Sequence, residues 1–127
     1  MPREIKYQVW HKQEKKMYVP NYLHFSPVGR LFGVLVKEGQ LLSVDDFELR
    51  EYTGLKDRTG QEIYEGDILR VDDESIGVIK YGVGCFYFDD CIDGRTALED
   101  IYAERIAVVL GNIYENLELL PKVEYAQ

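Results

Sequence analysis

Residues 66–90, with the sequence GDILRVDDESIGVIKYGVGCFYFDD, decide the fold of this chain. Three short runs rich in β-branched and aromatic residues lie in this stretch, at 68–71, 77–81 and 85–89, and turn-forming residues at 72–75 and 82–84 separate them. Strands this short, repeated every ~8–12 residues with turn signals between them, are typical of a small antiparallel barrel or sandwich. The stretch therefore predicts a mainly β protein, either all-β or α+β.

The residues on both sides extend this pattern to most of an antiparallel barrel over 62–115. The sequence predicts a buried strand at 106–110, a short turn or helix at 96–105, and a short helical turn at 115–120 behind an asparagine cap at Asn116. We expect the apolar residues that alternate along the strands to point inward. These residues are Ile63, Ile68, Val71, Val78, Phe86, Phe88, Val108 and Ile113.

Three glycines that precede the strand predicted at 68–71 stand six residues apart, at Gly54, Gly60 and Gly66. A phosphate-binding loop would need a Gly-Lys-Ser/Thr ending and a strand-to-helix junction, and the sequence has neither here. We therefore expect each glycine to supply a turn with positive φ. Asp57 and Asp67, which lie near these glycines, are expected to cap the turns by accepting hydrogen bonds from backbone N–H groups.

We expect residues 1–51 to form a β-rich segment with a hairpin and residues 52–127 to form the barrel segment, with both in one compact unit. Residues 5–10 alternate between apolar and polar side chains, and a polar run at 11–16 leads to a second short run at 17–19, which predicts a hairpin with a lysine-rich turn. Two further short strands are expected at 31–36 and 40–44. A helix over 40–52 is the alternative, although the β-branched and aromatic content favours a strand.

Charge and length narrow the classes of partner. The 127 residues fit one compact unit, and a net charge of −8 opposes binding to duplex DNA, which depends on Lys and Arg at the phosphates. Residues 1–20 differ from the rest, with five Lys or Arg residues against two Glu residues. A basic edge on an acidic body attracts a partner or a second copy, whereas lysines that guard an edge strand are the alternative explanation.

The sequence offers no complete catalytic, cofactor or metal site. Cys85 and Cys91 lie far from His11 and His24 and lack the spacing of a zinc site, so we expect two reduced thiols in the core. The acidic turn at 72–74 and the group Asp89, Asp90 and Asp93 do not match a calcium loop. The chain is therefore predicted to be no enzyme and to need no cofactor.

No run of residues approaches the ~18 apolar positions that a membrane span requires, and the N-terminus lacks the apolar stretch of a signal peptide. A cytoplasmic protein that does not contact a membrane is the expectation.

Three separated motifs carry a family resemblance. The runs at 52–57, 62–68 and 111–116, together with the opening at 3–6, closely resemble the YopX-like proteins of bacteriophages and prophages. The chain departs from that pattern at His11, where an aspartate is expected, and at Leu117, where a proline commonly follows the asparagine. The motif residues are expected to be structural: Tyr52, Gly54, Leu55, Asp57, Ile63, Tyr64, Glu65, Gly66, Asp67, Gly111, Asn112, Ile113, Tyr114 and Glu115.

The resemblance implies fold and origin more than activity. It implies a mainly β protein with an SH3-like barrel in its C-terminal part, encoded by phages of Gram-positive bacteria and present in the host cytoplasm. The biochemical role of the family is uncharacterised, so the resemblance assigns no substrate.

The leading functional hypothesis is a small protein-binding or assembly module that engages a host or phage protein. The alternative is single-stranded nucleic-acid binding through the basic N-terminal hairpin. Self-association of two copies through that hairpin is a third expectation, since Trp10 supplies an aromatic anchor beside the charges. The surface that carries these hypotheses consists of Trp10, Lys12, Lys15 and Lys16.

Overall fold

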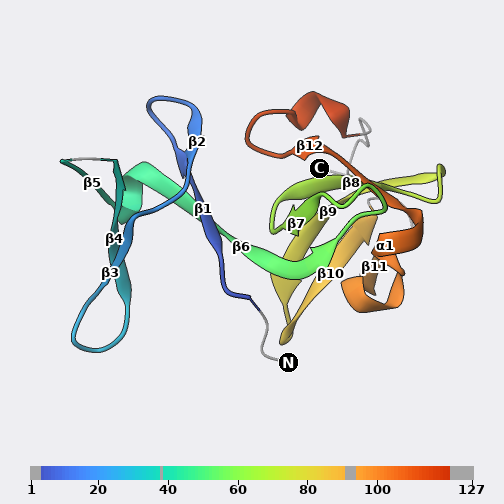
Figure 1. Cartoon of the computed structure of the whole chain (residues 1–127), viewed down its shortest axis with the longest axis horizontal. Helices are drawn as coiled ribbons and strands as arrows, with labels where there is room; N and C mark the ends of the chain where they lie inside the picture. Colours follow the sequence, from blue (N-terminus) through green and yellow to red (C-terminus); the bar gives the residue numbers. More distant parts are fainter. Residues whose placement is uncertain (1–3, 38, 91–93, 121–127) are drawn as a thin grey trace, which may run out of the picture. The chain divides into compact units, whose positions relative to one another are not determined.

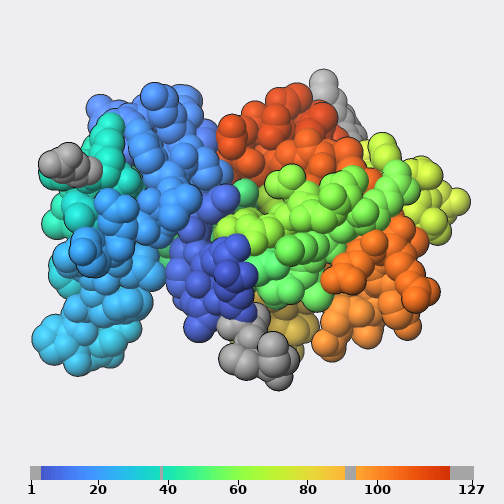
Figure 2. Space-filling view, viewed as in Figure 1, coloured from blue at the N-terminus to red at the C-terminus, as the bar shows by residue number. Residues whose placement is uncertain are grey.

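The computed structural model describes residues 4–37, 39–90 and 94–120 and shows a mainly β chain (Figure 1). The chain divides into two compact units. Ile5–Glu51 forms one unit, here called the N-terminal unit, and residues 52–120 together with Glu4 form the described part of the other, the C-terminal unit. In the space-filling view the N-terminal unit runs from blue to teal along the colour bar, and the C-terminal unit from green to red (Figure 2). The boundary between the two units falls within one strand, β6 (Phe47–Lys56).

The N-terminal unit contains two antiparallel arrangements. β1 (Tyr7–His11) pairs with β2 (Lys16–Tyr18), placing Trp10 opposite Met17, and on its other side with residues 47–51 of β6. The predicted hairpin is therefore confirmed. β3 (Tyr22–Phe25), β4 (Leu31–Lys37) and β5 (Gln40–Ser43) form a three-stranded sheet in that order. A 3₁₀ turn, η1 (Val44–Asp46), separates β5 from β6, so residues 40–51 are strands interrupted by a turn and not a helix.

Alternation along these strands builds the core of the N-terminal unit. Val34 and Val36 on β4 lie two positions apart and therefore point to the same face of the sheet. Leu42 pairs with Val34 from β5, and Leu23 pairs with it from β3. The buried members of this core are Val9, Val34, Val36, Leu42 and Phe47.

The C-terminal unit is a half-barrel of antiparallel strands, as the pattern around residue 66 predicts. β7 (Glu62–Tyr64) pairs with the second half of β6. β8 (Asp67–Val71), β9 (Ser75–Gly82), β10 (Cys85–Asp90), β11 (Gly94–Ala97) and β12 (Ala107–Asn112) form a five-stranded sheet in the order β11-β10-β9-β8-β12. The short helical elements are η2 (Leu98–Asp100), α1 (Ala103–Ile106) and η3 (Leu117–Leu119).

Part of the predicted inward-facing set lies in the core. Ile63 and Phe88 are core members, and Val71 and Phe86 pack partly buried against them. Ile68 and Val78 are buried but lie outside this cluster, because the neighbouring residues Leu69 and Ile79 are the ones that β8 and β9 turn toward it. The prediction that Val108 points inward is wrong by one position. Ala107 is buried in the core and Val109 packs against it, so the alternation of β12 turns Val108 to the other face. Ile113 lies beyond the end of β12 and is half-buried.

The three evenly spaced glycines all adopt positive φ, with values of 90° at Gly54, 90° at Gly60 and 88° at Gly66. The predicted positive φ is confirmed at all three positions. Gly60 and Gly66 lie in turns as predicted, whereas Gly54 lies inside β6, where the pairing with β7 is irregular. Gly66 is also held on both sides, because its N–H donates to the Ile79 carbonyl and its own carbonyl accepts from the Ile113 N–H.

The cysteine prediction is wrong where the structure tests it. Cys85 is exposed at the start of β10, directly after the turn at 82–84. Because β10 turns Phe86 and Phe88 toward the core, the alternation of the strand turns Cys85 to the other face. Cys91 and Asp93 lie outside the described residues. Within the described ranges no group of three or more His, Cys, Asp or Glu side chains is placed to hold a metal ion.

Candidate functional site

The motif residue Asp57 organises one turn and one sheet edge. Its Oδ1 accepts hydrogen bonds from the backbone N–H groups of Thr59, at 2.8 Å, and Gln61, at 2.9 Å, and from the Thr59 hydroxyl at 2.7 Å. Its Oδ2 accepts from the backbone N–H of Val109 at 2.9 Å. Burial alone would raise the pKa of Asp57, but these hydrogen bonds from Val109, Thr59 and Gln61 outweigh it and hold that pKa below its ordinary value.

Asn112 plays a similar part at the end of β12. Its Oδ1 accepts from the backbone N–H groups of Tyr114, at 3.0 Å, and Glu115, at 2.9 Å, while its Nδ2 donates to Glu115 Oε1 at 3.1 Å. Gly111 is required beside it, because a Cβ there would overlap the side-chain amide of Asn116. That amide accepts from the Asn112 N–H, so Asn116 makes no side-chain cap for η3.

The remaining motif residues pack around these two turns. Asp67 Oδ2 accepts from the Tyr64 N–H at 2.8 Å, and the rings of Tyr52 and Tyr64 lie 5.4 Å apart. A Cβ on Gly66 would come within 3.1 Å of the Tyr114 ring. All these positions belong to the C-terminal unit, and the contacts named here hold turns and strand ends in place.

The predicted basic surface is less positive than its sequence indicates. Lys12 forms an ion pair with Glu48, 3.5 Å away, and donates to the Asp45 carbonyl. Lys15 and Lys16 are exposed, and Trp10 is half-buried on β1. Lys15 and Lys16 therefore remain to offer positive charge to a partner, because the Glu48 carboxylate already neutralises Lys12.

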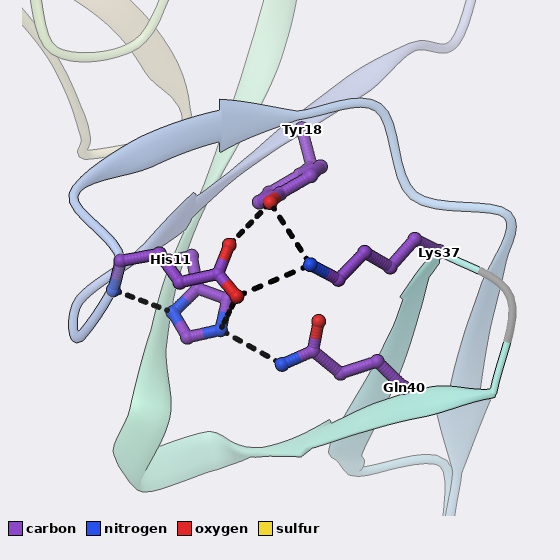
Figure 3. A network of polar contacts seen from close by, with 5 residues as sticks. His11, Tyr18, Lys37 and Gln40 are labelled. Atoms are coloured by element: carbon purple, nitrogen blue, oxygen red, sulfur yellow. Dashed lines mark hydrogen bonds and ion pairs between the residues drawn. The ribbon is translucent and has the colours of Figure 1, made fainter.

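A polar network that the sequence analysis does not predict surrounds His11 (Figure 3). The His11 side chain is 3% exposed, and its Nδ1 accepts a hydrogen bond from the Glu14 backbone N–H at 3.2 Å. Since Nδ1 is an acceptor, the proton of the neutral ring lies on Nε2. His11 thereby closes the β1–β2 turn as an aspartate carboxylate would.

Gln40 is the second partner of the His11 ring, with its side-chain amide 3.0 Å from Nε2. Figure 3 draws the amide nitrogen toward the ring, while the buried Gln40 Oε1 has no hydrogen-bond partner in the described structure. The opposite orientation of the amide has the same shape. It places Oε1 opposite the Nε2 proton, whereas the orientation drawn sets two N–H donors against each other, so we assign the opposite orientation.

Glu14, Tyr18 and Lys37 complete the network on the exposed side. The Tyr18 hydroxyl donates to Glu14, and Lys37 Nζ lies 3.2 Å from Glu14 Oε2 (Figure 3). The hydrogen bonds from Tyr18 and then Lys37 hold the pKa of Glu14 below its ordinary value. The network joins the β1–β2 hairpin to β4 and β5, so it stabilises the N-terminal unit, and its central ring is too buried to meet a substrate.

The outer face of the β3-β4-β5 sheet exposes apolar and aromatic side chains. Tyr22, Leu35 and Leu41 form one row across the three strands, opposite to the face that packs into the core. Tyr22 is 65% exposed and Leu41 is 57% exposed. Phe32, which lies at the irregular pairing of β3 with β4, adds an aromatic ring 6.1 Å from that of His24.

The edges of the sheets differ in how they are protected. In the C-terminal unit, the Asp57 turn covers β12, because the Arg58 N–H donates to the Ala107 carbonyl and Asp57 accepts from Val109. The edge strand β2 carries Lys16, and β11 carries Arg95. β3 has the sequence Tyr-Leu-His-Phe with no charged residue, and among the described strands it pairs with β4 alone. β3 is therefore an edge strand without the charged residues or proline that usually protect such an edge from pairing with another chain.

A cavity of about 270 Å³ lies within the C-terminal unit, between η2 and α1. Leu98 and Ala103 are buried in its wall, and Leu55 from β6 adds a half-buried side chain. The exposed side chains around it are Glu99, Tyr102, Glu104 and Arg105. None of these four residues was singled out from the sequence, because their spacing matches no known motif.

The fold defines the chain as a mainly β protein of two small antiparallel units. A family model described as YopX protein matches residues 6–121, and the chain belongs to the YopX family, as the three motifs predict. No helix among the described residues is long and apolar enough to cross a membrane.

Two solved structures are similar over nearly the whole chain. Protein EF1440 from Enterococcus faecalis is 26% identical, with a TM-score of 0.72 over 94% of this chain and 100% of that one. Protein yopX from Bacillus subtilis is 24% identical, with a TM-score of 0.61 over 91% of this chain and 98% of that one, and it supports the fold alone. No curated protein sequence matches the chain.

Proposed function

We propose that this chain is a phage- or prophage-encoded protein-binding module of the bacterial cytoplasm, and that it binds an extended segment of a host or phage protein along β3. The observation that carries the proposal is the uncharged open edge of β3 beside the row formed by Tyr22, Leu35 and Leu41. An added strand gains main-chain hydrogen bonds from such an edge. Its alternate side chains gain apolar contacts from the exposed face.

The chemistry of the partner follows from the two surfaces that it would meet. The edge needs a segment in β conformation without proline, and the outer face needs an aliphatic or aromatic residue at every second position. The other edge of the same sheet is less open, because Gln40 at the start of β5 contacts His11, and Asp46, just beyond its end, accepts from the Lys12 N–H. This difference favours β3 as the docking edge.

Photo-crosslinking in host cells tests the proposal. A photoreactive phenylalanine analogue replaces Tyr22 in one chain and Tyr81, which is 55% exposed in the C-terminal unit, in a matched control. We expect a partner protein to crosslink at position 22 and not at position 81. Once purified, that partner should bind the unmodified chain and lose about tenfold or more in affinity to the Tyr22→Lys variant, since lysine guards an edge strand.

Three outcomes would overturn the proposal. One is a partner that crosslinks only at position 81, and another is a purified partner that binds Tyr22→Lys as tightly as the unmodified chain. The third is crosslinking of position 22 to a second copy alone, with sedimentation velocity confirming a dimer, which would make β3 a self-association edge. Binding of labelled single-stranded oligonucleotide with a steep salt dependence would instead favour the basic hairpin with Lys15 and Lys16.

A further inference from the structure

The cavity between η2 and α1 combines an apolar wall with a charged rim. Leu55, Leu98 and Ala103 supply the apolar part, and Glu99 and Glu104 stand exposed beside it with Arg105. At about 270 Å³ it lies below the ~300–1,000 Å³ that is usual for sites of drug-sized ligands. A cavity of this size suits one side chain rather than a whole cofactor.

Tyr102 at the rim has a backbone conformation that tyrosine rarely adopts. Its φ of 53° and ψ of 51° place it in the left-handed region, immediately before α1. Glycine or asparagine is the usual residue there, because a Cβ is strained in this conformation. The Tyr102 side chain is 70% exposed, so burial of the ring does not compensate for the strain. The Tyr102 carbonyl accepts hydrogen bonds from the Arg105 and Ile106 N–H groups, so this conformation starts α1 and leaves the exposed Tyr102 side chain at the rim of the cavity.

We propose that this cavity recognises an arginine side chain of a partner protein, with the Tyr102 ring as its stacking surface and the Glu99 and Glu104 carboxylates as its acceptors. The aliphatic part of the arginine lies against Leu98 and Ala103. The inference concerns the C-terminal unit and uses no residue of β3, so it stands independently of the strand-docking function proposed above.

The lining of the cavity selects for arginine by charge and by shape. Two carboxylates and one guanidinium leave a net charge of −1 on the rim, which complements a single cation and repels phosphate. A guanidinium is planar, stacks on aromatic faces and binds carboxylates through paired N–H donors, whereas the lysine ammonium is a compact and strongly hydrated charge. The same unit already contains such a pair, since the Arg95 guanidinium lies 5.0 Å from the centre of the Tyr87 ring.

A peptide titration of the full chain labelled with ¹⁵N tests the inference. The probes are capped pentapeptides, Ser-Gly-X-Gly-Ser, in which X is arginine, citrulline, lysine, leucine or glutamate. Citrulline matches arginine in shape and lacks the charge. We expect arginine to shift the amide resonances of residues 98–105 and to bind about fivefold or more tightly than citrulline, with lysine intermediate and glutamate inactive.

Two variants separate stacking from charge. Tyr102→Gly keeps the backbone conformation favourable while removing the ring, and we expect it to weaken arginine binding about fivefold or more. Glu99→Gln combined with Glu104→Gln should remove the preference for arginine over citrulline. Lys80→Gln, which changes an exposed charge on β9, is the matched control and should leave binding unchanged.

Any one of several results overturns the inference. These are the absence of shifts at 98–105 with the arginine peptide, equal affinity for arginine and citrulline peptides, or unchanged arginine binding by Tyr102→Gly. A stronger response to the leucine peptide than to the arginine peptide would also overturn it, since the cavity would then be a purely apolar contact. None of these results bears on the crosslinking of position 22, so the two proposals fail separately.

Discussion

Asp57 accepts a hydrogen bond from the backbone N–H of Val109, 2.9 Å from its Oδ2 and 52 positions later in the sequence. The other oxygen of the same carboxylate accepts from Thr59 and Gln61 within its own turn. One side chain therefore both shapes the turn after β6 and satisfies the outer side of β12.

Replacing Asp57 by asparagine should lower the free energy of unfolding by about 1–3 kcal/mol. Both carboxylate oxygens face N–H donors, and the amide of asparagine would turn its own N–H₂ group toward one of them. Urea denaturation measures the loss. Asp72→Asn is the control, because Asp72 is exposed and has a φ of 55°, which asparagine tolerates. Equal stabilities of the two variants would contradict the assigned role of Asp57.

The same carboxylate predicts part of the response to acid. Because the pKa of Asp57 is lowered in the folded protein, its contribution to stability is complete above the unfolded pKa of about 4 and is lost as the pH falls through the folded pKa. The unmodified chain should therefore lose stability on acidification more steeply than Asp57→Asn. Glu14, whose pKa is also lowered, leaves some slope in the variant. Parallel stability curves between pH ~5 and pH ~2 would refute this assignment.

Gly66 and Gly60 share a backbone conformation and differ in their surroundings. A Cβ on Gly66 would meet the Tyr114 ring at 3.1 Å, whereas a Cβ on Gly60 has nothing within 4 Å. Gly60→Ala should cost about 1 kcal/mol from backbone strain alone, and Gly66→Ala about 2–3 kcal/mol from strain and crowding together. Thermal melts of the two variants provide the comparison. A similar shift in Tm for both would show that Tyr114 moves aside without cost.

Tyr102→Gly should raise the free energy of unfolding by about 1 kcal/mol, because glycine removes the strain of the left-handed conformation. Tyr102→Ala retains a Cβ and should bring no such gain. Chemical denaturation of both variants tests the strain without reference to any ligand. If both substitutions destabilise the chain equally, packing of the ring outweighs the backbone strain.

His11→Ala should destabilise the N-terminal unit, because it leaves the Glu14 N–H and the Gln40 amide without their buried partner. His11→Asp restores an acceptor for the Glu14 N–H and should lose less than His11→Ala. Urea denaturation at neutral pH ranks the two. The reverse order would mean that repulsion between the introduced carboxylate and that of Glu14 exceeds the value of the turn-closing hydrogen bond.

The sequence predicts the strands well because local signals determine them. The glycines at 60 and 66 and the turn formers at 72–75 and 82–84 divide the chain where the strands end, whereas Gly54 marks an irregularity inside β6. The N-terminal hairpin follows from the alternation at 5–10 and the polar turn after it. The Val108 error arises because four consecutive apolar residues at 107–110 show no alternation, so only the packing of β12 decides which face is inside.

The sites are less predictable because they depend on distant contacts. His11 meets Gln40, 29 positions away, and Lys37 reaches Glu14 across 23 positions. The cavity joins Leu55 to residues 98–105, and the strain at Tyr102 has no signature in the amino-acid order. The prediction of a buried Cys85 fails for the related reason that cysteine is usually buried, whereas this one follows a tight turn.

The strand order β11-β10-β9-β8-β12 also determines when each edge is paired during synthesis. β8, β9 and β10 each pair with the next strand in the sequence, so these pairings can form early, whereas β12 is separated from its partner β8 by 35 residues and arrives last. Until then the free edge of β8 is open, with Ile68 and Leu69 lacking their final cover. We therefore expect a chain that is stalled or cleaved before residue 107 to aggregate more readily than the complete sheet. Pairing with β12 removes this risk because it covers the open edge of β8.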